Sequence, residues 1–256
     1  MTYKVLSIDL DFIMGPCIET YAGIMFDEDP MVRWSHLYKF TDFTESMFQC
    51  DKDALLYCYD KFMKAMKTCS NVSFGYEHDE ILYHLRDKKD IDIINIDHHD
   101  DIFCADFGDD VPIGENVELE WEAMQRFGRV HEGNWGAWLH WKDKLEKFTW
   151  ITNSNSKNLQ KNEYNENLLG SKYETFTRDM FHEWDNYQDF DYIFVCLSPQ
   201  YMPQSHWYYF TMFMMAYETF TGKKVDVDTF AKRKFMQESK FDLVTDEILH
   251  KRTNGR

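Results

Sequence analysis

The segment NIDHHDDI, residues 95–102, places three aspartates and two histidines directly after an apolar run. Two unit charges about 4 Å apart interact by roughly 4 kcal/mol at an effective dielectric of about 20, so carboxylates crowded in this way repel one another strongly. A bound cation would remove that repulsion. The segment therefore indicates either a metal site at the end of a buried strand or a solvated acidic turn.

A second acidic segment, SIDLDF, lies near the start of the sequence and repeats the pattern of a strand that ends in carboxylates. Side chains alternate in direction along a strand, so Asp9 and Asp11 are expected on one face. The same alternation places Asp97, His99 and Asp101 together. If both strands end at one edge of a parallel sheet, the two rows meet there. The alternative is two acidic strand ends that cap neighbouring loops.

The residue types indicate which metal such a site would hold. Carboxylate and imidazole ligands without a thiolate suit Mn²⁺, Fe²⁺ or Zn²⁺. They do not indicate a structural zinc site of the thiolate type. Four acids with one or two histidines are more ligands than one tetrahedral ion can bind. Such a set suits two ions bridged by a carboxylate and a water molecule. Such a water becomes a hydroxide near neutral pH, which predicts a two-metal hydrolase.

The elements that would position these residues alternate between strands and helices. Strand patterns cover residues 3–12, 91–99, 147–154 and 191–199, and helical patterns cover 51–69, 78–87, 117–127, 137–148 and 206–220. This order predicts an α/β fold, a three-layer α/β/α arrangement with a mostly parallel central sheet. Polar loops are expected over 104–118 and 152–171. We expect a single domain over residues 1–256, with a frayed basic tail at 250–256.

Composition narrows the classes of partner. The net charge of −17 argues against nucleic-acid binding, because the chain lacks the basic surface that neutralises phosphates. Six cysteines without a Cys-x-x-Cys pair indicate reduced core residues of a cytoplasmic protein. We expect no signal peptide and no membrane span, since the most apolar stretch, 206–220, is too short. The sequence leaves the oligomeric state open.

The acidic motifs resemble those of a known superfamily. SIDLDF resembles the Ser-x-Asp-x-Asp motif of the arginase and agmatinase (ureohydrolase) superfamily, and DHHDD resembles its Asp-x-His-x-Asp motif. HEGNWGAWL (131–139) and LSPQYMP (197–203) are similar to segments of the peptide arginases, which convert arginine residues of ribosomal peptides to ornithine. The resemblance extends from residue 5 to about residue 207. It implies an arginase-like fold, two Mn²⁺ ions and an arginine-containing peptide as substrate. Ordinary arginases carry the aspartate pair late in the chain, so its early place here implies a circular permutation.

The resemblance also implies roles for particular residues. The metal ligands it implies are Asp9, Asp11, His78, Asp97, His99 and Asp101. His78 takes the place of the first histidine ligand, because it lies one strand-helix unit before the central motif. Asp101 is also expected to handle the proton that reaches the leaving amine.

The remaining motif positions are implied to face the substrate. His131 is expected to act as a proton shuttle, and Glu132 and Asn134 are expected to contact the substrate. Gln200 is also placed at the substrate, where an acid would be the natural partner of a guanidinium group. If relatives carry an acid at this position, the departure puts guanidinium recognition in doubt.

Two alternatives stay open at this point. A phosphoesterase of the class named for its Asp-His-His motif would use IDHH and an early DLD, although no small-residue phosphate loop follows DLD. A dehalogenase-type phosphatase also begins with Asp-x-Asp, but Ile13 stands where it would carry Thr or Val. The other alternative is a non-catalytic acidic metal-binding module. The residues do not separate free arginine, agmatine and peptidyl arginine as substrates.

Overall fold

A computed structural model describes residues 2–14, 34–35, 39, 49–102, 130–153, 169–182, 184 and 189–225. These residues form a six-stranded sheet in the order β2-β6-β1-β3-β4-β5, and every neighbouring pair is parallel. The strands are β1 (Tyr3–Asp9), β2 (Val72–Gly75), β3 (Ile91–Ile96), β4 (Leu145–Thr152), β5 (Tyr173–Thr177) and β6 (Tyr192–Cys196). The parallel sheet predicted from the alternating pattern is therefore confirmed.

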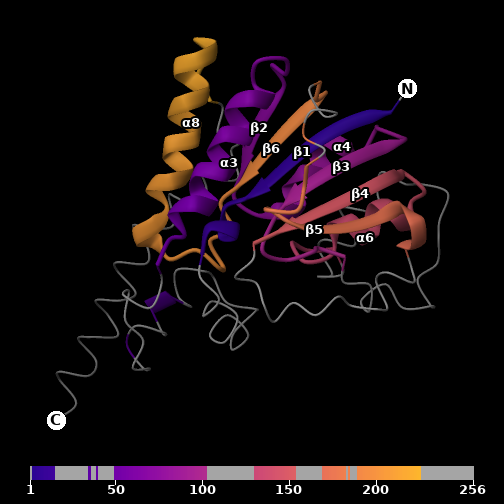
Figure 1. Ribbon diagram of the computed structural model, residues 1–256, viewed down its shortest axis with the longest axis horizontal. Helices are drawn as coiled ribbons and strands as arrows, with labels where there is room; N and C mark the ends of the chain where they lie inside the picture. Colours follow the sequence, from indigo (N-terminus) through magenta and orange to yellow (C-terminus); the bar gives the residue numbers. More distant parts are fainter. Residues whose placement is uncertain are drawn as a thin grey trace, which may run out of the picture.

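Helices cover both faces of this sheet (Figure 1). The longer helices α3 (Lys52–Ala65) and α8 (Tyr208–Thr221) pack on one face, and the shorter α4 (Leu82–Leu85) and α6 (Trp135–Trp141) pack on the other. The 3₁₀ turns are η1 (Leu10–Ile13), η3 (His78–Ile81), η5 (Gly170–Lys172) and η7 (Gln204–His206). The three-layer α/β/α fold is confirmed and is consistent with the arginase type.

The central strands are apolar on both faces because each face is covered. In β1, Leu6 and Ile8 belong to the core beneath α3 and α8, whereas Val5 belongs to the core on the opposite face. Both cores are fully buried at these positions. Strands buried on both sides read as nearly continuous hydrophobic runs, which explains why the predicted strands were clear in the sequence.

The two acidic strands end earlier than their patterns predict. β1 ends at Asp9, and Asp11 lies in the turn η1; β3 ends at Ile96, so Asp97 follows it. The Asp9 carboxylate accepts a hydrogen bond from Asp11 N at 3.1 Å, and the Asp97 carboxylate accepts one from His99 N at 2.9 Å. Such local bonds favour turns over extended backbone. The alternation argument was therefore wrong beyond these two strand ends.

Other boundaries also differ from the prediction. The short β2 and the half-buried edge strand β5 were not predicted. The pattern over 137–148 divides into α6 and β4, with Asp143 in a left-handed conformation at φ 53° between them. The helix expected over 117–127, most of the two polar loops and the tail at 250–256 lie outside the described residues. The expectation of a single domain stays a prediction.

Among the helices of the described residues, none combines the length and the apolar character that a membrane crossing requires.

Helix α3 begins at a cap that also ties it to the sheet. The Asp51 carboxylate accepts hydrogen bonds from Asp53 N at 2.9 Å and Ala54 N at 3.0 Å. Its other oxygen accepts from Asn153 Nδ2 at 3.2 Å and lies 3.3 Å from Arg178 Nη1. One side chain therefore joins α3 to residues that follow β4 and β5.

Replacing this cap is expected to destabilise the chain. Asp51→Ala should lower the free energy of unfolding by about 1–2 kcal/mol, the usual effect of losing an N-cap. Urea unfolding at neutral pH measures it. Asp60→Ala is the matched control, because Asp60 is half-exposed within α3 and pairs with Lys64 on the surface. Equal effects of both substitutions would contradict the capping role.

The stabilisation by Asp51 is expected to depend on pH. Burial would raise the pKa of Asp51, but the hydrogen bonds from Ala54 N and Asn153 and the Arg178 charge outweigh it and lower the pKa. The charged form therefore stabilises the fold above the unfolded pKa of about 3.9, and the effect is lost as the pH falls through the lower folded pKa. The difference between wild type and Asp51→Ala should shrink on acidification. A difference that grows towards low pH would contradict this sign.

Candidate metal centre

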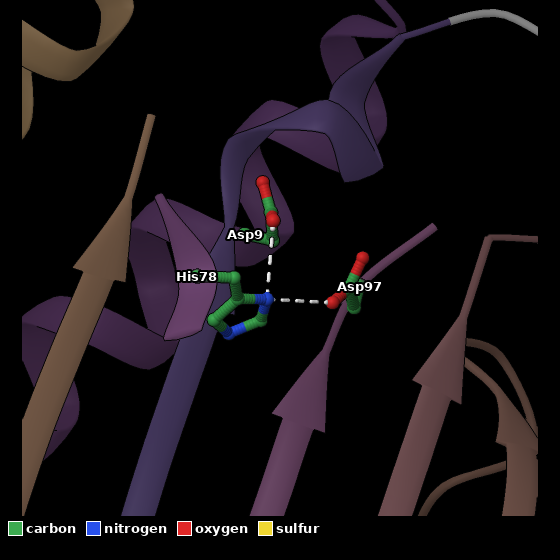
Figure 2. A group of neighbouring side chains, drawn as sticks. All are labelled: Asp9, His78 and Asp97. Atoms are coloured by element: carbon green, nitrogen blue, oxygen red, sulfur yellow. Dashed lines mark ion pairs between the residues drawn. The ribbon is translucent and has the colours of Figure 1, made fainter. Parts of the chain in front are cut away.

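Three side chains meet at the carboxyl edge of the central strands (Figure 2). Asp9 is the last residue of β1, Asp97 follows β3, and His78 begins η3 beyond β2. His78 Nδ1 lies 3.1 Å from Asp9 Oδ2 and 3.0 Å from Asp97 Oδ2. It also lies 2.7 Å from Asp101 Oδ2. Each of these four residues is at most 4% exposed, so water screens their charges little.

The His78 ring is placed as a metal ligand would be. Its Nδ1 makes no hydrogen bond of acceptable geometry, although carboxylate oxygens surround it. Its Nε2 lies 2.6 Å from Ser7 Oγ. When Nε2–H donates to the serine, the Nδ1 lone pair is directed at the carboxylates, and a shared cation would satisfy all of these groups. A histidine ligand is usually fixed in this way through its second nitrogen.

A second group of possible ligands shares Asp97 with the first. It consists of Asp11, Asp97 and His99, whose ligand atoms lie within 4.8 Å of one another. His99 Nδ1 lies 3.0 Å from Asp11 Oδ2, and the other Asp11 oxygen accepts from His98 N at 3.3 Å. Each group could hold a metal ion, and the shared aspartate places the groups side by side.

Neighbouring donors orient the carboxylates. Ser198 Oγ donates to Asp9 Oδ2, and Asn95 Nδ2 donates to Asp97 Oδ2 at 3.1 Å. Trp135 Nε1 donates to Asp101 Oδ2 at 2.6 Å. Asp101 and Ser198 both adopt left-handed backbone, at φ 55° and φ 47°. Such strained conformations persist where the surroundings fix them, which is common at functional sites.

Without a metal, the crowded negative charge of the cluster favours the protonated forms of some of its side chains. Burial and the charges of Asp9 and Asp97 raise the pKa of Asp11 well above its usual range. Burial and the Asp97 charge do the same to the pKa of Asp101. Burial would lower the pKa of His78, but Asp101, Asp9 and Asp97 outweigh it and raise that pKa. Burial would raise the pKa of Asp97, but His78 and His99 hold it below its usual range. Shifts of this kind mark sites that favour a cation.

The structure brings all six predicted metal ligands to one edge, whereas three of the predicted substrate residues, His131, Glu132 and Asn134, lie on a separate loop before α6. His131 Nδ1 accepts from Gly133 N at 3.1 Å, and Glu132 Oε2 lies 4.0 Å from the same ring nitrogen. Asn134 is fully buried, and its Oδ1 accepts from His131 N at 2.9 Å. Asn134 therefore holds the loop together, and its oxygen is already engaged.

Trp135 connects that loop to the metal groups. Its indole donates to the Asp101 carboxylate, and the next residue, Gly136, donates its N–H to Asp101 O at 3.1 Å. A side chain at position 136 would collide with Phe148, because its Cβ would lie 2.9 Å from that ring. Trp135 and Asp101 are 34 residues apart in the sequence, and no motif predicted their contact.

Gln200 lies on the loop after β6 and contacts an acid, Glu77, that no sequence motif indicated. Its Nε2 donates to Glu77 Oε1 at 3.2 Å. Ser198, on the same loop, was also missed as the donor to Asp9. Ser198 and Gln200 both follow the buried strand β6. Polar residues that come after a buried strand were therefore the sequence signal that could have identified them.

No family model matches this chain, and neither a curated protein nor a solved structure matches it. The fold and the side-chain geometry define an α/β protein with a buried aspartate–histidine cluster that could bind metal ions.

Metal binding is expected to depend on the shared aspartate. Asp97→Asn should weaken Mn²⁺ binding by more than the roughly 10–100-fold that loss of an outer-shell partner causes. Calorimetric titration of chelator-treated protein measures the affinity. Asp92→Asn, near the opposite end of β3, is the matched control and should bind like wild type. Unchanged affinity in Asp97→Asn would show that the cluster is not a metal site.

The stability of metal-free protein is expected to fall as the pH rises. Asp11, Asp101 and His78 have raised pKa values in the fold, so their protonated forms stabilise it. That stability is complete below the unfolded values, about 3.9 for Asp and 6.5 for His, and is lost as the pH rises through the folded ones. Asp97 has a lowered pKa and contributes no slope above about pH 4.

Melting temperatures measured between mildly acidic and mildly alkaline pH, with chelator and with Mn²⁺, test this expectation. Mn²⁺ competes with protons, so the rise in melting temperature that it produces should grow with pH. A rise that is independent of pH would contradict the assignment of these carboxylates to the metal centre.

Proposed function

We propose that this chain is a binuclear metal-dependent hydrolase that acts in the cytoplasm and releases urea from arginine residues of a peptide, leaving ornithine. The observation that carries the proposal is the pair of buried carboxylate–histidine groups that share Asp97. The first would hold one ion through Asp9, His78 and Asp97, with Asp101 beside it. The second would hold another through Asp11, Asp97 and His99. Oxygen and imidazole ligands favour Mn²⁺, with Fe²⁺ or Zn²⁺ as alternatives.

The reaction needs a nucleophile and a protonated leaving group. When bound, two divalent ions supply a hydroxide near neutral pH and neutralise the carboxylates. Water adds to the guanidinium carbon, the bond from this carbon to the side-chain nitrogen breaks, and that nitrogen leaves as an amine that takes up a proton. The products are urea and an ornithine side chain.

We assign to Asp101 the transfer of the proton that the leaving amine takes up. The Asp101 carboxylate lies 2.7 Å from His78 Nδ1, beside the ligands of the first group, where it can take up a proton from the attacking water. The Trp135 indole fixes one of its oxygens at 2.6 Å. The other oxygen can then receive the proton from water and return it to the leaving nitrogen.

His131 is assigned to exchange that proton with solvent. Because its Nδ1 accepts from Gly133 N, the neutral ring carries its hydrogen on Nε2. Its side chain is 35% exposed, which gives it access to water. Glu132, whose side chain is 23% exposed, can reach a substrate, whereas the buried Asn134 uses its oxygen to accept from His131 N.

The choice of substrate rests on the motifs that resemble peptide arginases and on charge. The net charge of −17 attracts a cationic peptide through long-range steering.

The proposal is tested with Mn²⁺-loaded protein and an arginine-containing peptide. We expect urea to appear with a peptide mass loss equal to urea less one water molecule. Asp9→Asn should abolish both, and Asp92→Asn should leave both unchanged. Bound metal without urea would contradict the proposal; cleavage of a phosphodiester would then support the phosphoesterase, and no turnover of either would support a non-catalytic metal-binding module.

A second prediction concerns His131. His131→Asn should lower kcat by about 100-fold or more, the range of general acid–base catalysis, without changing Mn²⁺ affinity. Added imidazole should restore part of the rate. His182→Asn, at an exposed histidine after β5, is the matched control. A rate within twofold of wild type in the His131 variant would exclude the shuttle role.

A further inference from the structure

A guanidinium substrate needs acceptors besides the metal ligands. It carries a positive charge and five N–H donors in a planar fork, which a carboxylate matches best. Gln200 stands where the sequence analysis expected such an acid. The structure supplies one next to it, because Glu77 Oε1 accepts from Gln200 Nε2 at 3.2 Å.

The Glu77–Gln200 pair joins two segments that each contribute to the candidate metal centre. Glu77 immediately precedes His78, whose Nδ1 faces the aspartates. Gln200 is two residues beyond Ser198, which donates to Asp9. Both members of the pair are therefore attached to residues that belong to or support the first metal group.

The same loop also reaches the second metal group. Tyr201, next to Gln200, packs on His99 with ring centroids 4.4 Å apart. The loop after β6 thus touches residues of both groups, and Gln200 lies between these two contacts.

The backbone beneath Glu77 is fixed. The buried Glu80 carboxylate accepts from Tyr76 N at 3.1 Å and from Glu77 N at 3.2 Å. Gly75 allows this close packing, because a Cβ there would lie 2.4 Å from the Phe194 ring and 2.9 Å from Glu80 Oε2. The position of Glu77 is therefore set by the turn that also sets His78.

The Gln200 side chain has an acceptor to offer. It is only 8% exposed, and its Oε1 has no hydrogen-bond partner among the described residues. The opposite amide orientation would place this oxygen against the Glu77 carboxylate, so Nε2 faces Glu77 and Oε1 is left for another donor. A buried acceptor without a donor is costly, and a ligand N–H would satisfy it.

We infer that Glu77 and Gln200 together form the recognition site for the cationic side chain of the substrate. The inference deepens the proposed function and rests on it. The Glu77 carboxylate pairs with the guanidinium, and Gln200 Oε1 accepts a further N–H. Gln200 also orients Glu77 through its amide nitrogen, so the pair takes the role of the acid missing at position 200.

The test compares charged and neutral peptides on Mn²⁺-loaded protein. A peptide in which citrulline replaces arginine has nearly the same shape but no charge. Glu77→Gln should lower kcat/KM for the arginine peptide at least about 10-fold, mainly through KM, because it removes a charge-assisted contact. Inhibition by the citrulline peptide should change less than twofold, and so should Mn²⁺ affinity.

Two further variants make the result decisive. Glu146→Gln, at an exposed residue near the opposite end of the sheet, is the matched control and should behave as wild type. Gln200→Leu keeps Glu77 but removes both the amide donor and the acceptor, and it should also raise KM for the arginine peptide. If the Glu77→Gln variant fails to bind Mn²⁺, the Gln200→Leu variant becomes the deciding test of the recognition site. Unchanged kcat/KM in the deciding variant overturns the inference.

Failure of the proposed function gives a different result. If wild type releases no urea, the proposed reaction is wrong, and equilibrium binding of the two peptides can be measured directly. A preference for arginine over citrulline that is lost in Glu77→Gln would still support the recognition site. No preference in wild type would overturn it.

Discussion

Repulsion among buried aspartates at one edge of the sheet is the constraint on which the rest of this structure depends. Asp9, Asp97 and Asp101 all approach a single nitrogen of His78 in a region with almost no solvent access. Without a cation, the chain relieves the repulsion by protonation, which is why the pKa values of Asp101 and His78 are raised. A divalent ion would relieve it without protons. The arrangement is therefore costly as a purely structural feature and reasonable as a metal centre.

The fold makes this concentration of charge possible. Parallel strands deliver their carboxyl ends to a common edge, and helices on both faces exclude water from the strands that carry the ligands. Donors from other elements then fix the carboxylates: Ser198 follows β6, and Trp135 begins α6. These contacts join the outer parts of the chain to the centre, so the site and the packing of the domain are mutually dependent.

An α/β sheet of this kind supports many reactions, so the fold alone does not identify a substrate. What narrows the chemistry is the set of residues around the metal groups. Asp101 lies beside the first group, the partly exposed His131 side chain has access to water, and the Glu77–Gln200 pair offers acceptor oxygens. Together they suit a cationic group that must lose an amine, which is the basis of the proposed reaction.

The sequence by itself determined four of the six strands, β1, β3, β4 and β6, because buried parallel strands leave clear apolar runs. It also located the aspartates and histidines, because polar residues after such runs stand out. It also placed Asp11 correctly for a wrong reason: Asp11 reaches the centre through a turn that Asp9 stabilises, and strand alternation does not bring it there. Only the tertiary structure decided the partners. The contact between Trp135 and Asp101 and that between Glu77 and Gln200 span 34 and 123 residues, and no local pattern encodes them. Periodicity reports which face of an element is buried, whereas a contact between distant side chains depends on how whole elements pack.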